Sequence, residues 1–230
     1  MMEQLPLRVR PHDFARFASF VPGRNVEVCD LLVRSDGPRV MWLWGRAGSG
    51  KSHLLQAACS AAGERGEPAL YLDLAQAPPG TMLDGSEALA LVCLDAVENI
   101  VQAVDWNAAI FRTYLALQET RGRLVIASTA PPASLDFQLP DLRSRLLAAS
   151  VHQLLELDEP GQCEALRLRA AARGMDLSDE AAAYLVHRLP RDMHSLFAVL
   201  ERLDVASLAA QRKLTIPFLR EQLEKEVSSG

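Results

Sequence analysis

Lysine is scarce in this chain of 230 residues, which contains three lysines, Lys51, Lys213 and Lys225. Acidic residues outnumber basic ones by 29 to 24, so the formal net charge is −5. Because non-specific binding to nucleic acid depends on clustered Lys and Arg, this balance argues against an extended phosphate-binding surface. A small local basic patch is still compatible with the composition.

Cysteine and long apolar runs are sparse too. The four cysteines lie far apart in the sequence, form no C-x-x-C pair and have apolar neighbours. We interpret them as reduced thiols rather than as metal ligands or a disulfide framework. No apolar run reaches the ~18 residues that a bilayer-spanning helix requires, and no secretory apolar segment follows Met1. We therefore expect a cytoplasmic protein without membrane insertion.

The most informative motif is a complete phosphate loop, G-x-x-x-x-G-K-[ST], at residues 45–52. It follows the apolar run 40–44 and precedes a helix-like stretch. In such loops backbone N–H groups surround a polyphosphate, the lysine places its charge between the β and γ oxygens, and the hydroxyl ligates Mg²⁺. The candidate nucleotide-binding residues here are Gly45, Arg46, Ala47, Gly48, Ser49, Gly50, Lys51, Ser52 and His53.

Five apolar runs, bounded by turn residues, alternate with helix-length segments. We expect strands at residues 40–44, 69–72, 89–94, 124–127 and 151–155. This alternation predicts an α/β fold with a parallel five-stranded sheet covered on both faces. The strands that precede the phosphate loop and end at Asp95 should be central, because their carboxyl ends must converge on the nucleotide.

Beyond residue 157 the pattern becomes helical. Helices are expected at 162–173, closed by Gly174, at 179–189, opened by Ser178, along a leucine stripe through Leu196, Leu200 and Leu203, and from about Ile216. We therefore predict three parts. These are a flexible N-terminal tail at 1–10, a nucleotide-binding α/β domain at 11–157 and a small all-helical lid domain at 158–230.

A second nucleotide signature is the apolar stretch Leu91–Leu94, which ends in Asp95. A carboxylate at the end of such a strand orients Mg²⁺, so Ser52 and Asp95 are the candidate metal ligands; the alternative is a buried strand followed by a loop-starting Asp. ATPases of this type usually carry a second acid at the next position, which is Ala96 here. Glu98 follows, but strand-end geometry puts it elsewhere. We predict weak or absent intrinsic hydrolysis and retention of a diphosphate.

These motifs stand in the order seen in DnaA-type AAA+ proteins, which the chain resembles over nearly its whole length. The resemblance is carried by Phe14–Asn25, the phosphate loop and the strand ending at Asp95. Leu139–Leu146 and Ala210–Phe218 also resemble the Hda family of DnaA regulatory inactivators. The resemblance implies an AAA+ core followed by a lid, with ADP or ATP as the cofactor and Mg²⁺ accompanying ATP.

The resemblance also assigns roles to single residues. It implies that the segment to Asn25, with Phe20, Val21 and Pro22, forms the adenine pocket. Thr129 stands where the family carries a polar sensor, often Asp, so the resemblance leaves γ-phosphate sensing in question.

Two arginines fall on family positions that contact phosphate. Arg145 matches the arginine finger, which reaches into the site of a neighbouring molecule and neutralises transition-state charge. Arg191 matches the sensor arginine of the lid. The alternatives are a surface charge on a short helix at 141–149 for Arg145, and a helix-start surface charge for Arg191.

The N-terminal tail contains Gln4, Leu5 and Leu7, in an arrangement that resembles the short peptide by which family members dock on the sliding clamp. Leucines of such a peptide enter an apolar pocket while the Gln hydrogen-bonds its rim. The partners implied are therefore DnaA and the sliding clamp (beta) of DNA polymerase III, with a homodimer as a further expectation.

The function implied by the resemblance is negative regulation of replication initiation. An ADP-bound AAA+ protein would dock on the DNA-loaded clamp and stimulate hydrolysis of DnaA-bound ATP. A stand-alone P-loop ATPase, a helicase-loader-like AAA+ protein and a small-molecule kinase stay open as alternatives. A DNA-binding initiator is disfavoured, because the sequence after Leu223 leaves no room for a helix-turn-helix domain.

Overall fold

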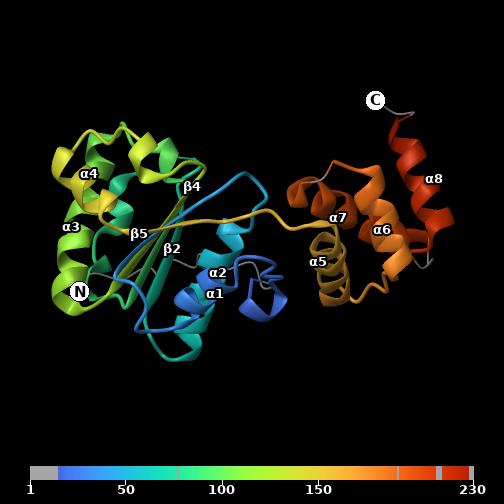
Figure 1. Cartoon of the computed structure of the whole chain (residues 1–230), viewed down its shortest axis with the longest axis horizontal. Helices are drawn as coiled ribbons and strands as arrows, with labels where there is room; N and C mark the ends of the chain where they lie inside the picture. The colour runs from blue at the N-terminus through green and yellow to red at the C-terminus, as the bar shows by residue number, and fades with distance from the viewer. Residues whose placement is uncertain (1–14, 77, 191, 211–213, 228–230) are drawn as a thin grey trace, which may run out of the picture. The chain divides into compact units, whose positions relative to one another are not determined.

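Short apolar segments pair into a five-stranded parallel sheet in the computed structural model, which describes residues 15–76, 78–190, 192–210 and 214–227 (Figure 1). The strands are β1 (Val40–Trp44), β2 (Ala69–Asp73), β3 (Leu91–Asp95), β4 (Arg123–Ser128) and β5 (Ser150–Gln153). Their order is β2-β3-β4-β1-β5, and all paired strands run parallel. This order confirms the predicted fold class and puts β1 and β3 inside the sheet, on either side of β4.

The chain divides into two compact units. The first contains a segment that ends at Ala18, then Val26–Arg46 and Gly50–Leu154. The second contains Ser19–Asn25, Ala47–Ser49 and the described residues from Leu155 onward. The division at Leu154 lies close to the boundary that we predict at residue 157, but the second unit also draws in two short segments from the N-terminal half.

Helices cover both faces of the sheet in the first unit (Figure 1). On one face lie α1 (Val26–Val33) and α2 (Lys51–Glu64), and on the other lie α3 (Val104–Thr120) and α4 (Pro140–Leu147). Trp42 of β1 and Trp106 of α3 are both buried in the core between the sheet and α3. These two tryptophans therefore serve packing rather than ligand stacking, as expected when strands alternate their side chains between two covered faces.

Short 3₁₀ turns connect several of these elements. They are η1 (Phe17–Ser19), η2 (Gly80–Leu83), η3 (Ser86–Ala88), η4 (Val97–Asn99) and η5 (Pro132–Ser134). The predicted start of a strand at Leu89 is wrong, because the Leu89 N–H donates to the Ser86 carbonyl and closes η3, so that β3 begins at Leu91. β5 likewise begins at Ser150 and ends at Gln153, so the expected range of 151–155 is shifted.

Four helices follow in the second unit. They are α5 (Glu159–Ala172), α6 (Asp179–Arg188), α7 (Met193–Ala210) and α8 (Ile216–Val227). The predicted start of the first of them at residue 162 is wrong, because the Asp158 carboxylate accepts the Gly161 N–H at 3.0 Å and caps a helix that begins at Glu159. Ser178 caps α6 as predicted.

One face of each of these helices contributes to a hydrophobic core in the second unit, which we call the lid core. Leu196, Leu200 and Leu203 of α7 are buried, which confirms the predicted leucine stripe. Within the described residues, no helix is long and apolar enough to cross a membrane. The four cysteines are free thiols.

Candidate nucleotide-binding site

The phosphate loop leaves β1 at Trp44 and enters α2 at Lys51. Gly48 and Gly50 have φ values of +79° and +94°, which L side chains rarely adopt. A Cβ at Gly48 would also lie 3.3 Å from the backbone nitrogen of His194, a residue of the same compact unit. The glycines are therefore required by the backbone path of the loop, as the motif predicts.

The N-terminus of α2 opens onto this loop. Its N-cap is Gly50, which provides no side-chain cap, and the first intrahelical hydrogen bond runs from the Leu54 N–H to the Gly50 carbonyl. The N–H groups of Lys51, Ser52 and His53 therefore precede the helical hydrogen-bond ladder, at the positive end of the dipole of a 14-residue helix. This arrangement suits the oxygens of a polyphosphate.

Lys51 is folded over the loop. Its Nζ donates to the carbonyls of Gly45 at 2.7 Å and Arg46 at 2.8 Å. Burial lowers the pKa of Lys51, while the nearby carboxylates of Asp95 and Glu98 act in the opposite direction. These two hydrogen bonds hold the ammonium against the backbone of the loop.

Asp95 ends β3 and is nearly fully buried, with 4% of its surface exposed. Its carboxylate accepts hydrogen bonds from the Tyr71 hydroxyl at 2.9 Å, from the Ala96 N–H at 2.9 Å and from the Ser52 hydroxyl. The structure thus brings Ser52 and Asp95 together, as two Mg²⁺ ligands of a nucleotide site should be. Burial nevertheless raises the pKa of Asp95 above its ordinary value of 3.8.

The substitution Asp95→Asn should stabilise the ligand-free protein at pH 7. Because the pKa of Asp95 is raised in the folded state, the folded state holds a proton more tightly, and stability falls as the pH rises from 3.8 through the raised pKa. The introduced carboxamide can still accept from the Ala96 N–H and donate to the hydroxyls of Tyr71 and Ser52. We expect a gain of about 1 kcal/mol, or roughly 2–4 °C in melting temperature.

Thermal unfolding at pH 7 and at pH 3.8 measures this effect. The gain should shrink at the lower pH, where wild-type Asp95 becomes protonated, and the same variant should bind Mg²⁺–ATP more weakly. A variant that is less stable than wild type at pH 7 would show that the hydrogen bonds to the carboxylate outweigh the cost of burying its charge.

Glu98 reaches the site by a route that sequence reasoning missed. Ala96 adopts φ +56°, an uncommon left-handed conformation for a residue with a Cβ, and η4 follows immediately. Glu98 Oε1 accepts the N–H of Thr129 at 3.2 Å, and its charge acts on Lys51. Glu98 Oε2 is buried and accepts no hydrogen bond from the described residues. Thr129 itself follows β4 and is exposed.

His53 lies in the first turn of α2, and its Nε2 is 2.9 Å from the Arg16 carbonyl oxygen. The ring is therefore directed to the backbone of the segment before η1. This contact is compatible with a role in fixing that segment to the start of α2, and the predicted nucleotide contact of His53 stays a prediction.

The predicted adenine segment belongs to the second unit. Val21 is buried in the lid core, Phe20 and Pro22 are half-buried, and Asn25 is 3% exposed. Asn25 forms a reciprocal pair with Leu155, since its Nδ2 donates to the Leu155 carbonyl at 2.9 Å and its Oδ1 accepts the Leu155 N–H at 2.8 Å. The segment is thus tied to the first residues of the lid unit.

Arg145 lies in the last turn of α4 and is exposed, in agreement with the predicted short helix, although that helix spans Pro140–Leu147 rather than 141–149. Leu142 and Leu146 bury the opposite side of α4 in the core. The predicted clamp-binding residues Gln4, Leu5 and Leu7 and the predicted sensor Arg191 lie outside the described residues.

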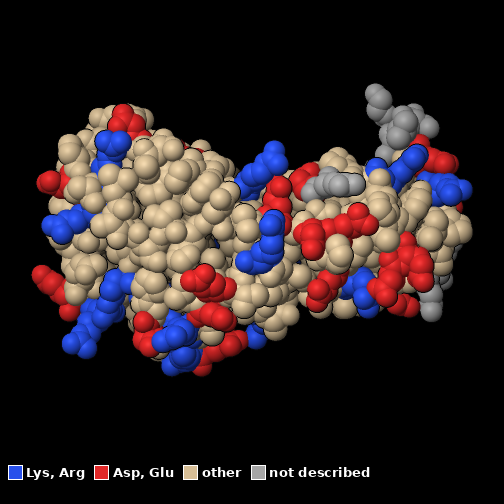
Figure 2. Space-filling model, in the orientation of Figure 1, with Lys and Arg blue, Asp and Glu red and all other residues tan. Residues whose placement is uncertain are grey.

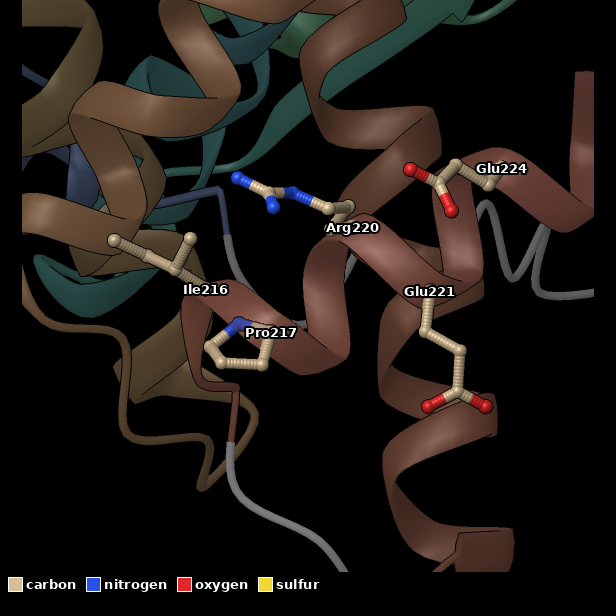
Figure 3. Close-up of a pocket in the computed structure, with 5 residues that line it drawn as sticks. All are labelled: Ile216, Pro217, Arg220, Glu221 and Glu224. Carbon is tan, nitrogen blue, oxygen red and sulfur yellow. The ribbon is translucent and has the colours of Figure 1, made fainter.

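A separate hollow of about 300 Å³ lies along α8 (Figure 3). It is lined by Ile216, Pro217, Arg220, Glu221 and Glu224, and in Figure 3 Glu221 points away from Arg220. Two carboxylates make this hollow a poor receptor for a polyphosphate. On the face shown in Figure 2, basic and acidic side chains are interspersed, and the described residues there form no continuous basic surface.

The lid and the whole fold are each similar to known proteins. Residues 158–223 match a family model described as "Hda, lid domain". The chain is similar to domain III of the replication initiation protein DnaA from Thermotoga maritima, with a TM-score of 0.78, 18% sequence identity, and coverage of 93% of this chain and 97% of that chain.

Two further structures share the fold. One is AMPPCP-bound DnaA from Aquifex aeolicus, with a TM-score of 0.69, 18% identity, and coverage of 94% of this chain and 72% of that chain. The other is the RuvB Holliday junction branch migration motor of Thermotoga maritima, with a TM-score of 0.69, 15% identity, and coverage of 91% and 71%. The five-stranded parallel sheet with its helices matches the AAA+ fold of these proteins. Over residues 158–223 the second unit is similar to the Hda lid domain, and the fold as a whole is similar to that of DnaA domain III.

Proposed function

We propose that this protein is a negative regulator of replication initiation, which binds ADP and stimulates the hydrolysis of ATP bound to DnaA. The observation that carries the proposal is an exposed Arg145 in a chain that has its own phosphate cradle. The phosphate loop accounts for nucleotide binding by this chain itself. The exposed guanidinium of Arg145 can contact the nucleotide bound to a second molecule. The Hda-type lid at 158–223 supports this interpretation.

Nucleotide binding would use the residues already described. The α2 N-terminus and Lys51 would hold the phosphates, and Ser52 and Asp95 would hold Mg²⁺ when ATP is bound. The metal would neutralise charge on the phosphates. The similar Aquifex aeolicus DnaA structure is bound to AMPPCP, which supports a nucleotide as the ligand here.

Intrinsic hydrolysis should be slow, and bound ADP should be retained. Ala96 provides no acid directly after Asp95, and Glu98 Oε1 is engaged by the Thr129 N–H. A general base must reach the proton that it removes, and a carboxylate already shared with a backbone N–H is a weaker base. The protein therefore acts mainly on the ATPase of its partner.

Docking on the sliding clamp would bring this protein to DnaA on DNA. The tail residues Gln4, Leu5 and Leu7 would bind the clamp, so that the encounter with DnaA becomes effectively intramolecular. A homodimer is a further part of the proposal. Light scattering with and without ADP would show a monomer throughout the micromolar range if that part is wrong.

Hydrolysis of radiolabelled ATP pre-bound to DnaA, in the presence of clamp-loaded DNA and ADP, tests the proposed function. Wild-type protein should accelerate the hydrolysis. Gln4→Ala should raise the concentration needed for half-maximal stimulation by at least about 10-fold and leave the maximal rate unchanged, because a tether changes effective concentration and not chemistry. Gln118→Ala, on the exposed side of α3, is the matched control. No acceleration by wild type would contradict the proposal.

A stand-alone ATPase is the second candidate, and Glu98 favours it. Its charge acts on Lys51, and its Oε2 accepts no hydrogen bond within the described part of the chain, so it could act on a water near the phosphates. Steady turnover of Mg²⁺–ATP by the purified protein without DnaA, abolished by Glu98→Gln, would support this candidate.

A further inference from the structure

Two loops of the first unit meet beside α4, the helix that carries Arg145. One is residues 100–103, which follow η4 and therefore lie a few residues after Asp95. The other is residues 135–139, which lead into α4. Asn107, in the first turns of α3, lies between the two loops and is 1% exposed.

The Asn107 carboxamide bonds to both loops at once. Its Nδ2 donates to the carbonyls of Ala103 at 2.8 Å and Val101 at 3.0 Å, and its Oδ1 accepts the N–H of Leu139 at 3.2 Å. Leu139 is the N-cap of α4 and has no side-chain cap of its own. A carboxamide is needed here, because a carboxylate could not donate and an aliphatic side chain could do neither.

Two exposed glutamines reinforce the same junction. Gln102 Nε2 donates to the Asp136 carbonyl at 2.8 Å, and the Gln138 N–H donates to the Val101 carbonyl at 3.3 Å. The Gln138 and Gln102 side chains also hydrogen-bond to each other. The start of α4 is therefore tied to the segment that continues from Asp95 by several polar contacts in addition to its apolar packing.

Apolar packing alone leaves α4 under-constrained. The helix has eight residues, of which Leu142 and Leu146 are buried on one side, while Leu139 before it and Ala149 after it are partly buried against the same core. Two leucines on one side resist lifting of the helix but oppose rotation about its axis and sliding along it only weakly. Arg145 projects from the exposed side near the far end, so any such movement displaces its guanidinium.

We propose that Asn107 is a positioning residue for Arg145, which fixes the N-terminus of α4 on the loop after η4. The inference rests on the proposed function, in which Arg145 acts on DnaA-bound ATP. It adds that the position of the Arg145 side chain depends on a buried amide of α3, which is hydrogen-bonded to the two loops. A displacement of about 1 Å in a reacting group can cost about 10²-fold in rate, so this junction should matter for the maximal rate.

The test compares Asn107→Leu, which matches the side chain in shape and removes its donor and acceptor, with a Gln102→Ala/Gln138→Ala double variant. The double variant changes only exposed side chains, so it can be used to test the same junction if Asn107→Leu does not fold. Gln118→Ala, elsewhere on α3, is the control. The first measurement is amide hydrogen exchange in α4, with β1 and β4 as internal references. We expect α4 amides to exchange about 10-fold faster in both variants while the strands are unchanged.

The second measurement is stimulation of hydrolysis of DnaA-bound ATP, resolved into a maximal rate and a half-saturating concentration. We expect the maximal rate to fall roughly 10- to 100-fold for Asn107→Leu, with the half-saturating concentration within about two-fold of wild type. Combined with Arg145→Ala, the variant should be no slower than Arg145→Ala alone, because it acts through Arg145.

The outcomes separate the inference from the proposed function. Unchanged exchange in α4 overturns the inference, as does a rate loss that appears entirely in the half-saturating concentration or that adds to the effect of Arg145→Ala. Lack of stimulation by wild-type protein, or full stimulation by Arg145→Ala, instead overturns the proposed function, and hydrogen exchange then still decides whether Asn107 holds α4 in place.

Discussion

Replacing Arg145 by Ala should reduce the maximal rate of stimulated hydrolysis of DnaA-bound ATP by about 10³-fold or more. An arginine that reaches the phosphates of a neighbouring site neutralises charge that develops in the transition state, and analogous fingers contribute about 10³ to 10⁵ in rate. Arg145 is exposed at the end of α4, whereas Leu142 and Leu146 are buried, so its removal leaves the core packing intact. The half-saturating concentration should change little.

Arg143 provides the matched control for this experiment. It lies two residues earlier on the same helix and is also exposed, but it projects in a different direction because successive residues of an α-helix are about 100° apart. Arg143→Ala should keep most of the stimulation. Arg145→Lys should recover only part of it, since an ammonium lacks the planar fork of the guanidinium. Equal losses for Arg143→Ala and Arg145→Ala would mean that general positive charge on α4, and not a finger, is what DnaA requires.

Local sequence patterns predicted the parts of the site that depend on neighbouring residues. The phosphate loop could be located because the apolar strand, the glycines and the helix follow one another along the chain. Asp95 could be located because an apolar run ends at it. The contact between Ser52 and Asp95 follows from the parallel sheet, since the carboxyl ends of interior strands lie on one edge.

The position of Glu98 could not be predicted in this way. Its approach to Thr129 depends on the left-handed backbone of Ala96, and alanine carries no sequence signal for a positive φ. The contacts of Asn107 could not be predicted from the sequence either. A polar residue in the first turns of a helix normally indicates an exposed or capping side chain, whereas here it is buried between two loops that are distant in sequence.

The grouping of Ser19–Asn25 with the lid unit also lay beyond sequence reasoning. Asn25 and Leu155 pair across 130 positions, and nothing in either segment specifies the other. The start of α5 was predicted too late, although Asp158 is a favourable N-cap and proline in the first turn of a helix is well tolerated. The predictions for Gln4 and Arg191 stay predictions, because both residues lie outside the described part of the chain.

Replacing Lys51 by Met should weaken the binding of ADP and ATP by roughly 10- to 150-fold. A hydrogen bond to a charged group contributes about 1.5–3 kcal/mol, and each 1.4 kcal/mol corresponds to a factor of about ten in affinity. Methionine keeps the aliphatic stem of the side chain and removes the ammonium that now donates to the carbonyls of Gly45 and Arg46. Titration with a fluorescent ADP analogue, with and without Mg²⁺, measures the change.

Measuring the thermal stability of the Lys51→Met variant separates a loss of nucleotide affinity from a loss of folding stability. Burial lowers the pKa of Lys51, which means that the folded protein holds the charged form at a cost, and this cost disappears in the variant. We therefore expect a melting temperature no lower than that of wild type in the absence of nucleotide, but a much smaller increase on adding ADP. Gln118→Ala, on the exposed side of α3 and outside the phosphate loop, is the control. Unchanged affinity in Lys51→Met would show that the loop backbone and the α2 N-terminus suffice to hold the phosphates.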